Sequence, residues 1–208
     1  MTLFDQDFWE HRWAQALHEH ADVVATRPPN AYLLAEAATL PTGRALDAGC
    51  GHGAEAFWLA AHGWHVTALD FAENVLAHAR ARAAALGPDL AARVDWIQGD
   101  LAKWTPPPNH YDLVVSFYVH VPGSVPQMVR RLSTGVAPGG TLLLAGHRPV
   151  DPATGQPTAA AGQNQISVAE AVGALDPQEW DIVFAEDRPR QAAGSGVDAV
   201  VRAARLPS

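Results

Sequence analysis

The chain has 208 residues, of which 48% are hydrophobic and 17% charged, a composition typical of globular rather than disordered proteins. Its 22 acidic and 14 basic residues give a net charge of −8, which leaves no obvious basic surface for the phosphates of DNA or RNA. No apolar run approaches the ~20 residues that a membrane span needs, so we expect no membrane partner.

The cysteine content and the N-terminus both favour a cytoplasmic protein. The chain has one cysteine, Cys50, which cannot form an internal disulfide. The first residues, MTLFDQDFWEHRW, have neither the basic nor the apolar region of a signal peptide. A chain of this length suits one α/β domain, so we expect a single domain over 1–208.

The N-terminal residues predict a helical cap over 1–40. Apolar residues recur about once per helical turn in 4–20, which predicts an amphipathic helix. Asn30 is a suitable N-cap for a second helix, from Ala31 to about Leu40, which Pro41 ends.

Short apolar runs then alternate with helical segments over a core of 41–208. Strands are predicted at 44–48, 65–70, 93–98, 111–117 and 141–147. Helices are predicted between them at 53–62, 72–87 and 125–136. This alternation favours an α/β fold with a doubly wound, mostly parallel sheet, because apolar strands without polar alternation are covered on both faces.

The C-terminal part predicts a loop, a helix and a hairpin. Residues 148–163 carry Pro, Gly and Thr without periodicity, and form either a substrate lid or a variable loop. Ser167 is a suitable cap for a short helix that ends near Leu175. The β-rich runs 180–186 and 198–206 predict an antiparallel hairpin.

The turn after the first predicted strand predicts a nucleotide site. It reads LDAGCGHG, and its glycines allow positive φ and a close approach of a ligand to the backbone. Asp70 follows 21 residues after Gly49 (70 − 49), at the end of the second strand, where a carboxylate accepts hydrogen bonds from a ribose. Gly49, Gly51 and Ala54 also fit the G-x-G-x-x-A pattern of dinucleotide sites.

Dinucleotides and S-adenosylmethionine are two classes of cofactor that suit such a turn, and Asp47 distinguishes between them. A pyrophosphate needs amide donors and a positive helix end rather than a carboxylate two residues before the first glycine. A carboxylate suits a cationic ligand, and S-adenosylmethionine carries both an ammonium and a sulfonium. The alternative is that Asp47 only caps the turn while the glycines pack the helix on the sheet.

Five segments in this order resemble the class I S-adenosylmethionine-dependent methyltransferases over about 40–147: LDAGCGHG, VTALD, QGDLAKW, YDLVVSFYVHVP and APGGTLLLAGH. The segments FWEHRW and RPPNAYLLAEAATLPTGRALD are most similar to the small bacterial thiopurine and tellurite-resistance methyltransferase-like group. The resemblance implies a Rossmann-like sheet of seven strands, mostly parallel, with the last strand inserted antiparallel.

The resemblance also implies binding roles in the first half of the chain. Asp70 matches the acid that binds the ribose, and Phe71 lies beside the adenine. The first motif, which holds the methionyl part of the cofactor, is matched by Asp47, Gly49, Cys50 and Gly51.

Further implied roles belong to residues outside these two motifs. Asp100 matches the acid that faces the adenine amino group, with the Leu101 amide near a ring nitrogen. Ser116 and Phe117, at the end of the fourth strand, border the methionyl side. Arg27 is either a partner of the cofactor carboxylate or a solvent-facing charge.

The chemistry requires an acceptor held in line with the methyl group, exclusion of water and management of one proton. His120, just past the fourth strand, is the catalytic candidate. Its neutral imidazole either removes a proton from the acceptor or orients the acceptor by a hydrogen bond. The alternative is that His120 is only a loop residue. His147 is a second, weaker candidate. A thiol acceptor needs no base, because its anion is already populated near neutral pH.

The histidines predict no metal site. His18 and His20 point to different faces of the N-terminal helix, unlike the pair in H-E-x-x-H. Trp9 and Trp13 lie four residues apart on one helical face, where they either cover the acceptor site or pack on the core.

We therefore expect an enzyme that uses S-adenosyl-L-methionine, forms S-adenosyl-L-homocysteine, and methylates a sulfur, oxygen or nitrogen atom of a small molecule. The alternatives are an NAD(P)-binding oxidoreductase and a non-catalytic S-adenosylmethionine-binding protein. The oxidoreductase is disfavoured because Lys103 is the chain's one lysine and no Tyr-x-x-x-Lys pair is present. We expect no nucleic-acid partner, and a monomer or homodimer.

Overall fold

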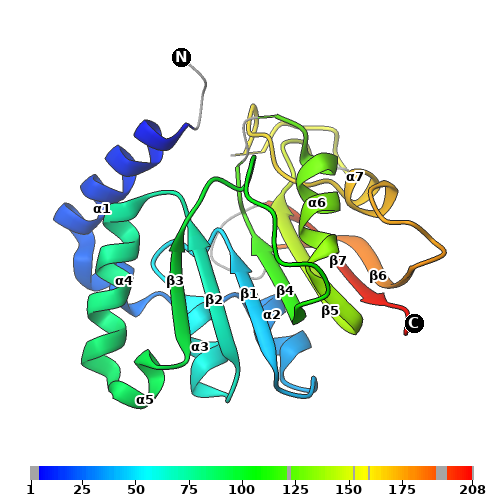
Figure 1. Cartoon of the computed structure of the whole chain (residues 1–208). Helices are drawn as coiled ribbons and strands as arrows, with labels where there is room; N and C mark the ends of the chain where they lie inside the picture. The colour runs from blue at the N-terminus through cyan, green and yellow to red at the C-terminus, as the bar shows by residue number, and fades with distance from the viewer. Residues whose placement is uncertain (1–4, 121–122, 152, 159, 191–195, 208) are drawn as a thin grey trace. The chain divides into compact units, whose positions relative to one another are not determined.

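A computed structural model of the chain describes residues 5–120, 123–151, 153–158, 160–190 and 196–207 (Figure 1). The chain forms two compact units, Met1–Trp104 and Thr105–Ser208. The expectation of a single domain stays a prediction.

In its described residues, the first unit contains three parallel strands and five helices. The strands are β1 (Arg44–Ala48), β2 (His65–Asp70) and β3 (Val94–Gln98), and β2 pairs in parallel with the other two. The helices are α1 (Gln6–Thr26), α2 (Ala31–Ala37), α3 (Ala54–Ala61), α4 (Glu73–Leu86) and α5 (Pro88–Ala91).

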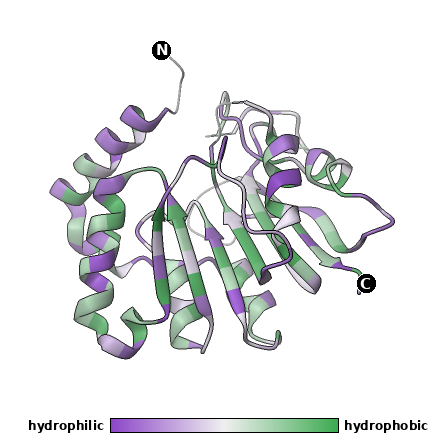
Figure 2. Cartoon of the chain, viewed as in Figure 1, coloured by the Kyte–Doolittle hydropathy of each residue, from purple (hydrophilic) through white to green (hydrophobic). Residues whose placement is uncertain are grey.

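Local sequence explains where the N-terminal helices start and bend. The Asp5 side chain accepts the backbone N–H of Phe8, and the predicted cap Asn30 accepts that of Tyr32. α1 bends at His20, whose backbone is not helical. Most of α1 is hydrophilic, in contrast to the apolar strands (Figure 2).

α1 is attached to the start of α4 through one glutamate. The Glu10 carboxylate accepts the backbone N–H groups of Glu73 and Asn74, at 2.6 and 3.3 Å. The Asn74 side chain donates in return to the Glu10 carbonyl. A carboxylate at a helix N-terminus satisfies orphan amides and the helix dipole together, so Glu10 fixes the cap on this unit.

The crossovers of the first unit share one packed core. Phe57 of α3 packs with Ala79 and Ala83 of α4, and Trp96 of β3 lies against them. The rings of Phe57 and Trp96 are 5.6 Å apart. Both helices therefore cover the same face of these strands, as right-handed crossovers between neighbouring parallel strands require.

Four strands and two helices are found in the part of the second unit that the structure describes. β4 (Tyr111–Phe117) pairs in parallel with β5 (Val136–His147). β7 (Val197–Arg205) pairs antiparallel with β5 and with β6 (Trp180–Pro189). The helices are α6 (Val125–Thr134) and α7 (Val168–Gly173). Ser167 caps α7, as predicted.

The seven strands follow the order β3-β2-β1-β4-β5-β7-β6. The predicted mostly parallel, Rossmann-like sheet with a C-terminal antiparallel hairpin and N-terminal helices is confirmed. Some boundaries differ. The fifth strand starts at Val136 because its PGG segment continues the strand, the second helix ends at Ala37, and the one-turn α5 was not predicted.

Two predicted segments include residues that the structure does not describe. The loop 148–163 is described except for residues 152 and 159, and contains a bridge between Val150 and Pro157. The middle of the hairpin connection, 191–195, lies outside the described residues. In the described part of the chain, no helix is both long and apolar enough to cross a membrane.

Candidate functional site

The glycine turn after β1 is tied to the end of β2. The backbone N–H groups of Gly49 and Cys50 both donate to the carbonyl oxygen of Leu69, at 2.8 and 3.0 Å. Gly49, Gly51 and Gly53 have φ values of 85°, 50° and 84°. This left-handed backbone strains any residue with a Cβ, which explains why glycine alternates through the turn.

Asp70 fastens the turn from the neighbouring strand. Its Oδ2 accepts the N–H of Gly51 at 2.9 Å, and its Oδ1 accepts that of Ala72 at 3.0 Å. Burial raises the pKa of Asp70, although these two amide hydrogen bonds oppose the rise. Each oxygen retains a second lone pair, so the predicted ribose contact is compatible with this structural role.

Asp47 is buried in the same turn, with only 2% of its surface exposed. Among the described residues, its Oδ2 atom has no hydrogen-bond partner. The pKa of Asp47 is raised well above its usual value by burial, then by the negative charges of Glu55 and Asp70, against one hydrogen bond from the Ala56 amide. A buried acceptor without a partner is costly, and a cationic donor would satisfy it.

Glu55, at the start of α3, was not predicted as a site residue from the sequence. Its carboxylate accepts the backbone N–H of Asn30 at 2.9 Å, and burial raises its pKa. The buried carboxylates of Asp47 and Asp70 and the half-buried carboxylate of Glu55 therefore form one group, which we call the acidic cluster. An acidic residue in the first turn after a glycine motif was the available signal, but it is also common as a helix-dipole partner.

Cys50 lies beside the acidic cluster and is buried. Burial, followed by the charges of Asp47, Asp70 and Glu55, raises the pKa of its thiol well above the usual value. The thiolate is therefore strongly disfavoured, and Cys50 lines the turn without acting as a nucleophile.

Trp13 of α1 lies against the glycine turn. A Cβ atom on Gly51 would come within 2.9 Å of the Trp13 ring, and the rings of Trp13 and His52 are 5.9 Å apart. Burial, then the positive charges of Arg27 and Arg82, lower the pKa of His52 to about 4, so this imidazole is neutral. These contacts place Trp13 on the glycine turn, and a cover by Trp9 and Trp13 over the acceptor site stays a prediction.

Asp100 and Leu101 follow β3 at the same edge of the first unit. The Gly99 N–H donates to the Asp70 carbonyl at 2.9 Å, which brings this segment beside the end of β2. Asp100 accepts the Ala102 amide at 2.8 Å and pairs with the Lys103 ammonium at 3.2 Å, while Leu101 is buried.

Two further predicted residues stay with this unit. The Phe71 carbonyl accepts the side-chain amide of Gln98. Arg27 is exposed at the C-terminal end of α1, and its charge acts on His52. The structure thus gathers the first-half candidates at the carboxyl ends of β1, β2 and β3, with Arg27 on the helical cap.

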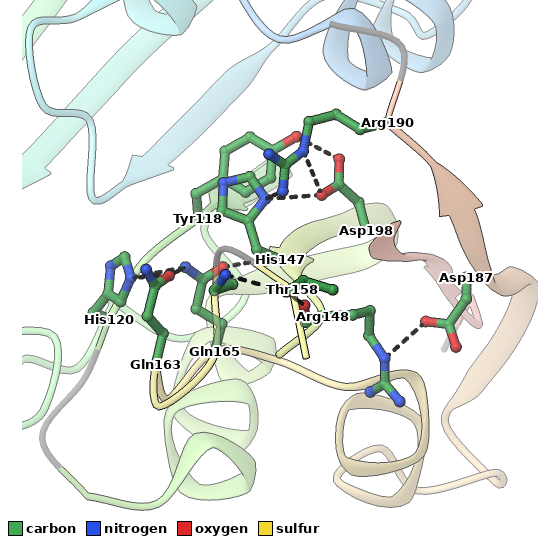
Figure 3. A network of polar contacts seen from close by, with 11 residues as sticks. Tyr118, His120, His147, Arg148, Thr158, Gln163, Gln165, Asp187, Arg190 and Asp198 are labelled. Atoms are coloured by element: carbon green, nitrogen blue, oxygen red, sulfur yellow. Dashed lines mark hydrogen bonds and ion pairs between the residues drawn. The ribbon is translucent and has the colours of Figure 1, made fainter. Parts of the chain in front are cut away.

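The other predicted residues belong to the second unit. Ser116 is buried and Phe117 half-buried at the carboxyl end of β4. His120 lies beyond them, and its Nε2 is 3.0 Å from the Gln163 oxygen and 2.8 Å from the Gln165 side-chain nitrogen (Figure 3). Burial lowers the pKa of His120, and the charge of His147 lowers it further, whereas the hydrogen bond with Gln163 raises it.

A second polar group in this unit surrounds His147, at the end of β5. Its Nδ1 is 2.8 Å from Oδ1 of Asp198, and its ring stacks on Tyr118 at 4.0 Å (Figure 3). Tyr118 donates its hydroxyl to Oδ2 of Asp198 at 3.0 Å, and Arg190 Nη2 lies 2.7 Å from His147 Nδ1. We call these four residues the His147 cluster.

Sequence reasoning missed Tyr118, Arg190 and Asp198. The one signal was an acid that opens the apolar run DAVV, since a charged residue in a buried strand needs partners. Tyr118 has a φ of 56°, which no sequence pattern predicted. In the described part of the chain, no group of three or more His, Cys, Asp or Glu side chains is arranged to hold a metal ion.

Comparison with known proteins agrees with this arrangement. The family model of a methyltransferase domain matches residues 45–140. Trans-aconitate 2-methyltransferase of Rhizobium meliloti is 36% identical over 133 residues, which are 62% of this chain and 48% of that protein. The chain thus spans about half the length of that relative.

Two other similarities cover more of the chain. A probable thiol methyltransferase 2 of Arabidopsis thaliana is 28% identical over 86% of this chain and 76% of its own length. An S-adenosylmethionine-dependent methyltransferase structure from Mesorhizobium loti has a TM-score of 0.67 and 24% identity, over 85% of this chain and 99% of that one. At this identity the structural likeness concerns the fold alone.

Proposed function

We propose that the chain is a class I S-adenosylmethionine-dependent methyltransferase, which transfers a methyl group from this cofactor to a small molecule. The match of residues 45–140 to the model of a methyltransferase domain supports this proposal. S-adenosylmethionine supplies an electrophilic methyl group on a sulfonium when bound. The chain's own task is to hold this cation, to orient an acceptor and to exclude water.

One observation carries the proposal: the buried Oδ2 of Asp47 has no partner among the described residues, and two more carboxylates of the acidic cluster lie beside it. Placing like charges together in a low-dielectric site is unfavourable until a cation binds there. The ammonium of S-adenosylmethionine is such a cation. The pyrophosphate of a dinucleotide would add negative charge to the same turn, which disfavours the oxidoreductase alternative.

The glycines support the same assignment. Side chains at Gly51 and Gly53 would overlap Trp13 and Trp96, so only bare backbone leaves the turn open. We assign the methionyl part to Asp47, Gly49, Cys50 and Gly51, the ribose to Asp70, and the adenine to Phe71, Asp100 and Leu101. Ser116 and Phe117, with Arg27 as a partner for the cofactor carboxylate, complete the proposed cofactor-binding set.

His120 stays our candidate for contact with the acceptor. Its lowered pKa keeps the imidazole neutral at physiological pH, and Gln163 and Gln165 fix its orientation. By their names, one of the related proteins above methylates trans-aconitate and the other a thiol, which supports a small-molecule acceptor here. A cytoplasmic location, a monomer or homodimer, and the absence of nucleic-acid partners belong to this proposal. The narrower likeness to the thiopurine and tellurite-resistance group also belongs to it.

The test is transfer of a labelled methyl group from S-adenosylmethionine to separate sets of small thiols, phenols, amines and carboxylic acids. We expect label in one chemical class and stoichiometric formation of S-adenosylhomocysteine. Binding of the cofactor without transfer to any class would instead favour the non-catalytic binding protein.

A further inference from the structure

The strand pairing of the second unit places His147 directly opposite Asp198. The two residues are register partners in the antiparallel pair of β5 and β7, so their side chains lie on one face of the sheet. Figure 3 shows the His147 ring beside the Asp198 carboxylate, with the phenol of Tyr118 behind it. Neither Asp198 nor Tyr118 has a role in the function proposed above.

Asp198 is an ionised carboxylate with only 1% of its surface exposed. Its two oxygens face the hydroxyl of Tyr118, the imidazole of His147 and, at 3.5 Å, the Nε of Arg190. Burial alone would raise the pKa of Asp198, but the hydrogen bonds from His147 and Tyr118 and the charges of His147 and Arg190 outweigh it and lower the pKa.

This carboxylate selects one tautomer of His147. An ionised carboxylate only accepts hydrogen bonds, so the 2.8 Å contact requires the proton on Nδ1. Arg190 only donates, so its 2.7 Å contact with the same nitrogen requires the opposite tautomer. The Asp198 contact prevails, because without it a fully buried oxygen would lose its nearest donor, whereas the Arg190 side chain is 21% exposed and reaches water.

The Nδ1–H tautomer leaves the lone pair on Nε2. Among the described residues, no hydrogen bond to the Nε2 of His147 is found, and the side chain is 25% exposed. Tyr118 fixes the ring plane by stacking at an angle of 24°, and its own backbone has a φ of 56°. Non-glycine residues persist in that conformation where the surroundings require it, often at functional sites.

We propose that His147, oriented by Asp198 and Tyr118, is the base that takes a proton from the methyl acceptor, and that the acceptor is a hydroxyl compound of the phenol or enol class. This inference rests on the function proposed above. A carboxylic acid is already ionised at neutral pH, and a thiol, with a pKa of about 8.5, already supplies a few per cent of strongly nucleophilic thiolate, so neither needs an oriented base. A phenol, with a pKa of about 10, does.

The acceptor oxygen forms a bond to the methyl carbon, and the carbon–sulfur bond breaks with its electron pair remaining on sulfur. The hydroxyl proton moves to Nε2 of His147, and the negative charge of Asp198 stabilises the resulting imidazolium until the proton passes to water. His147 would be the catalytic residue, with Asp198 and Tyr118 as positioning residues. The other charged and titratable groups that face this ring are Arg190 and His120.

The first test needs no substrate. Nitrogen-15 NMR of the histidine side chains distinguishes the tautomers, and a His147→Gln spectrum assigns the signal. We expect a neutral Nδ1–H imidazole in the native protein and loss of this preference in Asp198→Asn. A neutral Nε2–H form in the native protein would overturn the proposal.

The second test is kinetic. With small phenols as acceptors, the native rate should reach a plateau at a pH well below the pKa of the phenol. In His147→Gln, kcat should fall by about 100-fold or more and rise with pH toward the pKa of the phenol. Asp198→Asn should lower kcat by tenfold or more with KM nearly unchanged, whereas His65→Gln, at an exposed position in the other unit, should match the native enzyme.

The outcomes separate the two proposals. If S-adenosylhomocysteine binds but only thiols or carboxylic acids are methylated, or no phenol is, the acceptor class is wrong while the cofactor assignment stands. If phenols are methylated equally well by His147→Gln, the base is wrong. If S-adenosylhomocysteine does not bind, the proposed function itself fails.

Discussion

Replacement of Asp47 by asparagine changes the charge of the acidic cluster with almost no change in shape. Burial and the charges of Glu55 and Asp70 raise the pKa of Asp47, so the ligand-free protein holds a proton there up to an unusually high pH. A ligand ammonium favours the ionised carboxylate, so its binding must expel that proton. Below the raised pKa, affinity should therefore rise by up to about tenfold per pH unit.

The magnitude for the variant follows from the lost contact. A hydrogen bond to a charged partner contributes about 1.5–3 kcal/mol, so Asp47→Asn should weaken binding of S-adenosylhomocysteine by about 10- to 150-fold above the raised pKa. The loss should shrink at lower pH, where the native carboxyl is itself protonated. Asp95→Asn, at an exposed position on β3, is the matched control and should bind like the native chain.

Stability should change in the opposite direction to binding. A carboxyl group whose pKa is higher in the folded chain than in the unfolded chain stabilises the folded state. This contribution is complete at pH values below the unfolded pKa, which is about 3.9. That contribution is lost as pH rises through the folded pKa. The unbound native protein should therefore become less stable across this window, and Asp47→Asn should lack that part of the slope. Thermal unfolding against pH measures it.

Calorimetry at several pH values, in two buffers with different heats of ionisation, counts the protons released on binding. We expect release by the native protein and none from this site in Asp47→Asn. Equal affinity of both proteins, with no proton release by either, would refute the reasoning that a cation pairs with Asp47.

The remaining predictions concern the turn itself. Gly53→Ala should lower the free energy of unfolding by about 1–3 kcal/mol, because its φ is 84° and the new Cβ would lie 2.6 Å from Trp96. Gly155→Ala has a similar φ of 68° but meets no atom within 4 Å, so chemical denaturation of both should show the smaller loss there. Asp70→Ala should lower stability by about 2 kcal/mol, since the amide of Gly51 loses its acceptor, and weaken S-adenosylhomocysteine binding at least tenfold. Unchanged stability and affinity would remove Asp70 from both roles.

The sequence predicted most of the helices and strands along the chain, because the signals for them are local. Apolar runs gave β1, β2 and β4 at their observed bounds, and side-chain caps placed the starts of two helices. The end of the second helix and the one-turn α5 were not predicted, because short helices depend on packing more than on propensity.

The site was predictable only where it follows a contiguous motif. The glycines and the acids Asp47 and Asp70 are close to strand ends in the chain, so their pattern survives in one dimension. The partners of His147 were not predictable, because Asp198 meets His147 only through the pairing of β5 with β7, 51 residues apart. Glu55 was overlooked for a different reason: an acid in a first helical turn has an ordinary explanation.

Calorimetric titration of the native chain with S-adenosylhomocysteine, with NADH as the comparison, tests the central claim most directly. We expect micromolar binding of S-adenosylhomocysteine and no binding of NADH, because the acidic cluster favours a ligand ammonium and repels a pyrophosphate. Binding of NADH without S-adenosylhomocysteine would contradict the assignment of Asp47 and turn the site toward hydride transfer.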